Sequence, residues 1–223
     1  MEQQVFVTTL AGKNAFLFAD GIGTGASINQ PIGVAVDTSG NVYVADTYNH
    51  RIRKITSGGV VSTLAGSVSF FFADGIGTGA SFNKPSGVAV DTSGNVYVAD
   101  TNNHRIRKIT SGGVVSTLAG NVSSIFADGI GAGASFRYPS GVTVDTSGNV
   151  YVADTSNHRI RRLIFAGCLA GTECIDPVSP LPCPKNTRCM PCSSVRFLFF
   201  SVTFAILCSY SHPRSLFVYA GFI

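Results

Sequence analysis

Histidine, aspartate and arginine recur together in the motif D-x-x-N-H-R, which occurs three times at intervals of 54 residues. Its histidines are His50, His104 and His158. Three imidazoles from three equivalent segments could coordinate a zinc ion. Alternatively, each imidazole could hydrogen-bond within its own turn, with the aspartate of the same motif (Asp46, Asp100 or Asp154) as its partner. We favour the second interpretation, because the histidines fall in turns of separate repeats rather than around one point. The sequence therefore predicts no metal site.

Each histidine motif runs into a short basic segment, at Arg51–Lys54, Arg105–Lys108 and Arg159–Arg162. Regularly spaced basic patches could contact the phosphates of a nucleic acid. However, residues 1–164 carry a net charge of only +2, out of +4 for the whole chain, which disfavours a nucleic-acid partner. We expect these segments to be solvated outer strands whose charge discourages edge pairing.

Two further segments begin like known ligand-binding loops, but each lacks residues that such a loop needs. D-T-S-G-N (37–41) begins like a calcium loop, but the glutamate that would complete the ligand set is missing. G-I-G-T-G (21–25) is not followed by the Lys-Ser/Thr pair of a phosphate loop. Every other candidate for acid, base or nucleophile belongs to the repeat and occurs three times, whereas an active site usually combines different residues. The sequence predicts no catalytic residues and no cofactor.

The elements that position these residues are short strands with the same period. Residues 31–66 and 85–120 are identical at 34 of 36 positions. Within one period, β-branched and aromatic residues predict strands at 33–37, 41–46, 51–56 and 60–66, separated by polar and glycine-rich turns. Four short antiparallel strands per repeat are typical of one β-propeller blade. The 3.6-residue period of a helical repeat is missing.

The repeat resembles the NHL family of β-propellers. The resemblance rests on P-x-G-V-A-V-D-x-x-G-N-V-Y-V-A-D-x-x-N-H-R-I-R-K, which stands at Pro31–Lys54 and Pro85–Lys108, and at Pro139–Arg162 with Thr143 for alanine and Arg162 for lysine. It extends over residues 5–164. It implies a blade whose G-V-A-V-D strand lies nearest the central axis, and a non-catalytic scaffold that binds a protein or a ligand. A metal-dependent lyase or hydrolase and an RNA-binding module are the alternatives within this resemblance.

We therefore expect an all-β fold: a partial β-propeller of three four-stranded NHL-type blades, half of a six-bladed ring, with an irregular C-terminal tail. The ends of the repeat region are offset by one strand. Val5–Leu10 matches a fourth strand, and the third repeat stops after its third strand, near Ile164. Two chains could thus seal one ring, and we expect self-association. The alternative is that the sequence is a piece of a longer propeller.

Long loops precede the three blades, at 11–30, 66–84 and 120–138. By strand order they open on the same face as the D-x-x-N-H-R turns, and loop residues are well placed to contact an unidentified protein or small ligand. The alternative is that each loop phenylalanine packs inward over its own blade. The predicted binding face comprises Phe18, Asp20, Phe72, Asp74, Phe126, Asp128, His50, His104, His158, Arg51, Arg105 and Arg159.

Composition divides the chain into 1–164, 165–194 and 195–223. None of the six cysteines precedes Cys168, and the spacing of the five up to Cys192 loosely resembles small extracellular modules of the EGF or receptor type, with their pairing left open. The apolar run 197–213 is short for a spanning helix, so it is either a membrane anchor or unstructured. The cysteines favour an extracellular or membrane-associated protein, although the first residues, MEQQVFVTTLAGK, lack the features of a secretory signal.

Overall fold

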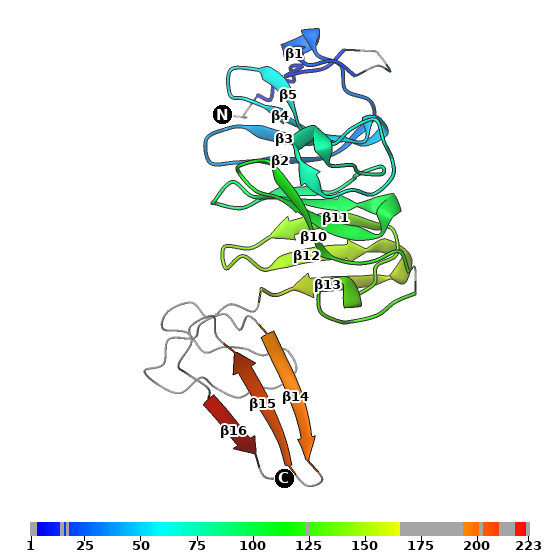
Figure 1. Cartoon of the computed structure of the whole chain (residues 1–223). Coiled ribbons are helices and arrows are strands. Elements are labelled where there is room, and N and C mark those ends of the chain that lie inside the picture. The colour runs from blue at the N-terminus through cyan, green and yellow to red at the C-terminus, as the bar shows by residue number, and fades with distance from the viewer. Residues whose placement is uncertain are drawn as a thin grey trace. The chain divides into compact units, whose positions relative to one another are not determined.

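The computed structural model describes residues 4–13, 16, 18–123, 125–165, 194–200, 203–209 and 217–221. The chain divides into two compact units, Met1–Ile164 and Phe165–Ile223 (Figure 1). The first unit contains the three repeats. Its elements are antiparallel strands joined by turns and short 3-10 helices, which confirms the predicted all-β fold.

Each repeat folds into one antiparallel sheet, a blade, in which neighbouring strands follow the order of the sequence. The first blade contains β2 (Pro31–Val36), β3 (Val42–Asp46), β4 (Arg51–Ile55) and β5 (Val60–Ala65). The second contains β7 (Val88–Val90), β8 (Val96–Asp100), β9 (Arg105–Ile109) and β10 (Val114–Ala119). The third contains β11 (Pro139–Val144), β12 (Val150–Asp154) and β13 (Arg159–Leu163). These strands lie where the sequence predicts them.

The turn between the first and second strands is built around one aspartate. Asp37 accepts the backbone N–H groups of Ser39 and Asn41, at 2.9 and 2.8 Å, and the Tyr43 hydroxyl at 3.1 Å. The Asn41 side chain also donates to it, and this bond is the main reason why the pKa of Asp37 is lowered. Burial, together with the bond to Asp37, raises the pKa of Tyr43 to about 12. The carboxylate is thus occupied by its own hairpin turn.

The long loop before each blade adds a strand that the sequence does not predict. β1 (Gly21–Ile22) pairs with β5 of the blade that it precedes, and β6 (Gly75–Ile76) pairs with β10 in the same way. The first two sheets therefore have five strands, in the orders β1-β5-β4-β3-β2 and β6-β10-β9-β8-β7. A two-residue strand shows no alternation of polar and apolar residues, so it left no sequence pattern to detect.

Short 3-10 helices shape two kinds of turn. One kind lies in the long loop, where it follows the added strand in the first two repeats, and the other kind contains the middle of the D-x-x-N-H-R motif. They are η1 (Gly23–Gly25), η3 (Gly77–Gly79) and η5 (Gly131–Gly133) in the loops, and η2 (Thr47–Asn49), η4 (Thr101–Asn103) and η6 (Thr155–Asn157) in the motifs.

One predicted strand is wrong for the single chain. Val5–Leu10 forms no strand, and its side chains are exposed, with Val7 at 94%. In the other repeats the equivalent segment pairs with the third strand of its own blade. The described residues before this segment include no third strand with which it could pair in the same way.

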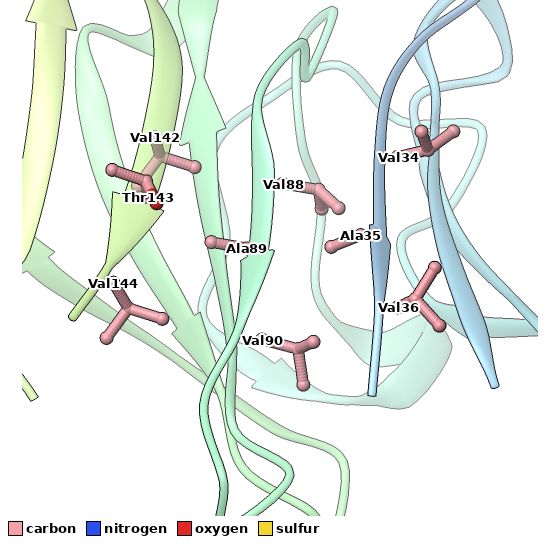
Figure 2. Close-up of a pocket in the computed structure, with 9 residues that line it drawn as sticks. All are labelled: Val34, Ala35, Val36, Val88, Ala89, Val90, Val142, Thr143 and Val144. Carbon is pink, nitrogen blue, oxygen red and sulfur yellow. The ribbon is translucent and has the colours of Figure 1, made fainter. Parts of the chain in front are cut away.

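Neighbouring blades pack face to face and share apolar cores. Phe82, from the loop before the second blade, is fully buried in a cluster with Ile52 of the first blade and Val98 of the second. The first strands approach so closely that a Cβ atom at Gly33 would lie 2.2 Å from the carbonyl oxygen of Ser86. Glycine is therefore required where β2, β7 and β11 lie side by side (Figure 2).

In the second unit, the described residues form a three-stranded antiparallel sheet of β14 (Ser194–Phe200), β15 (Thr203–Ser209) and β16 (Phe217–Gly221). The aromatic and β-branched residues of the apolar run favour strands, where the sequence analysis expected an irregular tail. Within the described part of the chain, no helix combines the length and apolarity needed to cross a membrane. The prediction about the cysteines at 168–192 falls outside the described residues.

Candidate functional site

The histidine turns connect neighbouring blades. His50 has a left-handed backbone, with a φ of 57°, and its Nδ1 accepts the backbone N–H of Lys84 in the next loop at 3.1 Å. His104 accepts the N–H of Tyr138 at 3.2 Å in the same way. Burial, and then the charges of Lys84 and Arg51, lower the pKa of His50, so the imidazole is the neutral acceptor that this bond requires. For these two histidines the predicted bond to the aspartate of the same motif is therefore wrong, because each binds the following repeat instead.

The aspartate of the motif holds a buried arginine. The Arg53 guanidinium is fully buried and donates to Asp46 at 2.8 Å, to Asp20 at 2.6 Å and to the carbonyl oxygens of Ser27 and Ala19 at 3.0 and 2.9 Å. Asp46 is also completely buried, so the pair is shielded from water. Arg107 and Arg161 make the same four bonds in their blades.

This arrangement corrects the expectation of a solvated basic strand. Arg53 and Arg107 are completely buried, and the neighbouring Arg51 is 9% exposed, because the long loop folds over them. The second arginine of each basic segment is thus a structural residue. Its charge is balanced by two carboxylates and is not available for phosphates.

The predicted loop phenylalanines lie on the same arginines. The Phe18 ring centroid is 4.0 Å from the guanidinium carbon of Arg51 and 4.7 Å from that of Arg53. Phe72 and Phe126 stack in the same way on the arginines of their own blades, at 4.0 and 3.9 Å from the first of each pair. The structure thus brings the predicted Phe, Asp and Arg side chains together within each blade, and the alternative of inward packing describes their position. Their contact with a partner stays a prediction.

The tips of the long loops carry apolar side chains that the sequence analysis did not single out. We call this set the loop crest: Phe16, Val68, Phe70, Phe71, Val122 and Ile125, which are 56% to 81% exposed. The Phe70 ring lies 5.8 Å from that of His50 and 5.7 Å from that of Phe71, measured between centroids. The loops therefore open beside the histidine turns. The sequence signal for this set was the run of three phenylalanines at 70–72, of which only Phe72 packs on the blade.

An apolar hollow lies between the first strands of the three blades (Figure 2). It is open, has a volume of about 290 Å³ and is lined by Val34, Ala35, Val36, Val88, Ala89, Val90, Val142, Thr143 and Val144. The lining includes no ionisable side chain, and Thr143 is its one polar member. The side chains that line the hollow thus supply no carboxylate, imidazole, amine or thiol, and the Thr143 hydroxyl has no acid or base beside it in the lining. Elsewhere in the described part, no three His, Cys, Asp or Glu side chains come close enough together to hold a metal ion.

The comparison with protein families decides the nature of the repeat. The family model for the NHL repeat matches residues 29–55, 82–109 and 136–163, which are the three blades. The chain contains three NHL repeats. It is 41% identical over 100 residues to Protein SUPPRESSOR OF QUENCHING 1, chloroplastic, of Arabidopsis thaliana, a match that covers 44% of this chain and 10% of that protein. It is 38% identical over 106 residues to NHL repeat-containing protein 2 of Homo sapiens, covering 42% and 14% of the two chains.

The solved structures show the same fold. A structural genomics protein of unknown function from Bacteroides thetaiotaomicron matches with a TM-score of 0.55 and 29% sequence identity, over 63% of this chain and 36% of that one. The chain thus spans about a tenth of the Arabidopsis relative and about a third of this structure. The shared part is the β-propeller module itself.

Proposed function

We propose that this NHL-repeat chain is a non-catalytic interaction module that binds a protein partner through the loop crest. The observation that supports this most directly is a contrast within each repeat. The buried arginine and its two aspartates are occupied by bonds within the blade, and His50 and His104 by bonds to the next repeat. The large apolar side chains at the loop tips, in contrast, are exposed.

Exposed apolar side chains that gather on one face of a protein often mark an interaction surface. Phe70 and Phe71 are 56% and 78% exposed although they contact each other, so their outer faces are available to a partner. Aromatic residues supply much of the binding energy in protein interfaces. The chemistry fits a partner segment with aromatic or aliphatic side chains. The positive charge of Lys84, which acts on His50 beside Phe70, favours acidic groups at the edge of that segment.

A peptide display experiment on the full chain tests this proposal. Random peptides are selected on the wild type and then measured on the double variant Phe70→Ser, Phe71→Ser. The matched control is Ile76→Ser, because Ile76 is 70% exposed but lies on β6, outside the crest. We expect enrichment of aromatic and aliphatic peptides whose affinity falls at least about tenfold on the double variant and stays unchanged on the control.

Two results would count against the proposal. Peptides that bind the double variant as well as the wild type would remove the crest from the binding surface. A stoichiometric metal in the purified protein would favour a metal-dependent lyase or hydrolase instead.

A further inference from the structure

Among the described residues, the third blade has no counterpart of the strand that completes the other two. In the first blade, β5 lies between β4 and the added strand β1, and in the second blade β10 lies between β9 and β6. In the third blade, β13 is an edge strand in the described part of the chain. Ile160 on β13 is 76% exposed, whereas its equivalents Ile52 and Ile106 are completely buried. A strand edge with an exposed isoleucine is thus left open beside the loop that precedes this blade.

The loop on the far side of this gap keeps its ion pair but lacks its other donor. Asp128 binds Arg161 at 2.7 Å, just as Asp20 binds Arg53 and Asp74 binds Arg107. In the complete blades, Thr63 on β5 also donates to Asp20 at 3.3 Å, and Thr117 on β10 donates to Asp74 at 3.2 Å. The described residues provide no such threonine for Asp128. Its side chain is therefore 82% exposed, compared with 50% and 46% for the other two.

The N-terminal segment has the sequence of the missing strand. F-V-T-T-L-A-G (6–12) corresponds to V-V-S-T-L-A-G (60–66), so that Thr9 stands for Thr63 and Val7 for Val61. Gly12, at the end of this segment, already makes the backbone bond that its equivalents make in the complete blades. The Gly12 N–H donates to the Gly23 oxygen at 3.2 Å, just as Gly66 donates to Gly77 at 3.2 Å. The rest of the segment has no strand partner, and Val7 is 94% exposed whereas Val61 is 1% exposed.

We propose that residues 5–10 of one copy insert between β13 and Gly129–Ile130 of a second copy, and that two copies thereby close one ring of six blades. By the register of β4 with β5, Leu163 would face Val7 and Arg161 would face Thr9 of the second copy. The Thr9 hydroxyl then supplies the missing bond to Asp128. Val7 becomes buried as Val61 is.

A second copy is required because the segment is anchored on the first blade of its own chain and the open strand edge belongs to the third. Gly12 holds it on the first blade, while the open edge belongs to the third, and the second blade lies between them (Figure 1). Leu10 is only two residues from this anchor, so the segment cannot lie at the edge of the third blade while Gly12 stays on the first. The partner must therefore present the same segment, which a second copy of this chain does.

The faces of the end blades also match. Within the chain, a Cβ at Gly87 would lie 2.4 Å from the Ser140 oxygen of the next blade. Among the described residues, the equivalent Gly141 faces no further blade, and a Cβ there would meet the Ala153 Cβ at 3.5 Å. On the first blade, Ile32 stands where Ser140 stands, and it is 64% exposed. The same docking that inserts the strand would therefore bring the Ile32 backbone against Gly141 and cover both faces.

Sedimentation of the full chain over a dilution series tests the proposal with two neighbouring substitutions. Val7→Asp places a charge where the inserted strand would be buried. Thr8→Asp places the same charge on its outer face, because Ser62 and Ser116, its equivalents, are exposed. Both positions are exposed in the single chain, so neither change should affect its folding. We expect a wild-type dimer, a dissociation constant raised at least about 100-fold by Val7→Asp, and a change of less than about threefold for Thr8→Asp.

Gly141→Ala adds an independent test at the other contact. It should leave the fold of the single chain intact and weaken the dimer, because its Cβ would clash with the second copy. A wild-type chain that sediments as a monomer would overturn the proposal. So would equal effects of Val7→Asp and Thr8→Asp, or an open series of larger assemblies in place of a dimer.

Discussion

Removing the buried guanidinium of the middle blade should destabilise the repeat unit severely. Arg107 and Asp100 are both completely buried and lie 2.7 Å apart. With Arg107→Met, Asp100 keeps only neutral donors, the N–H of Asn83 and the amide of Asn103. Leaving one charge of a buried pair without its partner costs about 3–5 kcal/mol. The lost bond to Asp74 adds little, because that carboxylate is half exposed.

We therefore expect Arg107→Met to lower the free energy of unfolding by about 4 kcal/mol, a large share of the roughly 5–15 kcal/mol of a typical domain. The measurement is urea denaturation followed by circular dichroism, with hydrogen exchange of β8 and β9 as a local probe. Lys108→Met is the matched control on the next residue. Its ammonium lies 5.8 Å from the Tyr97 ring, a contact worth about 0.5–1 kcal/mol. If the two variants differed by less than about 1 kcal/mol, the buried arginine would not be the organising residue that we describe.

Three further predictions concern the turns. Burial lowers the pKa of His104 below 6.5, so the contribution of the neutral imidazole to stability should be complete above pH 6.5. Below pH 6.5 the unfolded chain binds the proton first, and stability should fall. His104→Asn should reduce this loss in thermal unfolding measured over a pH series. Gly120→Ala should cost more than about 3 kcal/mol in urea denaturation, because its Cβ would lie 2.4 Å from the His104 oxygen, whereas Gly113→Ala, which meets nothing, should cost about 1–2 kcal/mol. Burial and the bond to Asp91 raise the pKa of Tyr97 to about 12, and Asp91→Asn should lower it in an alkaline absorbance titration.

Much of the fold could be predicted from the sequence because each blade is encoded locally. Strands such as Val42–Asp46 are rich in β-branched and aromatic residues, and the Asp37 turn is formed by residues within six positions of one another. What the sequence analysis missed depends on contacts between repeats. The bond from Lys84 to His50 spans 34 positions, and the pairing of Gly21 with Val61 joins a loop to the end of the next blade. No pattern within a short stretch of sequence indicates such contacts.

The loop segment that contains the predicted Phe and Asp residues is identical in the three repeats. F-A-D-G-I-G occurs in all three loops, beginning at Phe18, Phe72 and Phe126. This identity invited a functional interpretation. The structure gives it a structural reason, because the phenylalanine stacks on two arginines and the aspartate pairs with the buried one. A segment that must cover the same arginine in each blade has to stay the same.

The loop tips are the part of the repeat in which the three copies differ most. Directly before F-A-D-G-I-G stand K-N-A-F-L (13–17), S-V-S-F-F (67–71) and N-V-S-S-I (121–125). The described members of these tips include the exposed residues of the loop crest, and none of those packs in a blade core. Substitution there costs the fold little, so each tip is free to differ. A closed ring would present these different tips side by side on one face, above blades that are almost identical. Selectivity for a partner can therefore reside in the tips, whereas the invariant histidines, arginines and aspartates serve the fold.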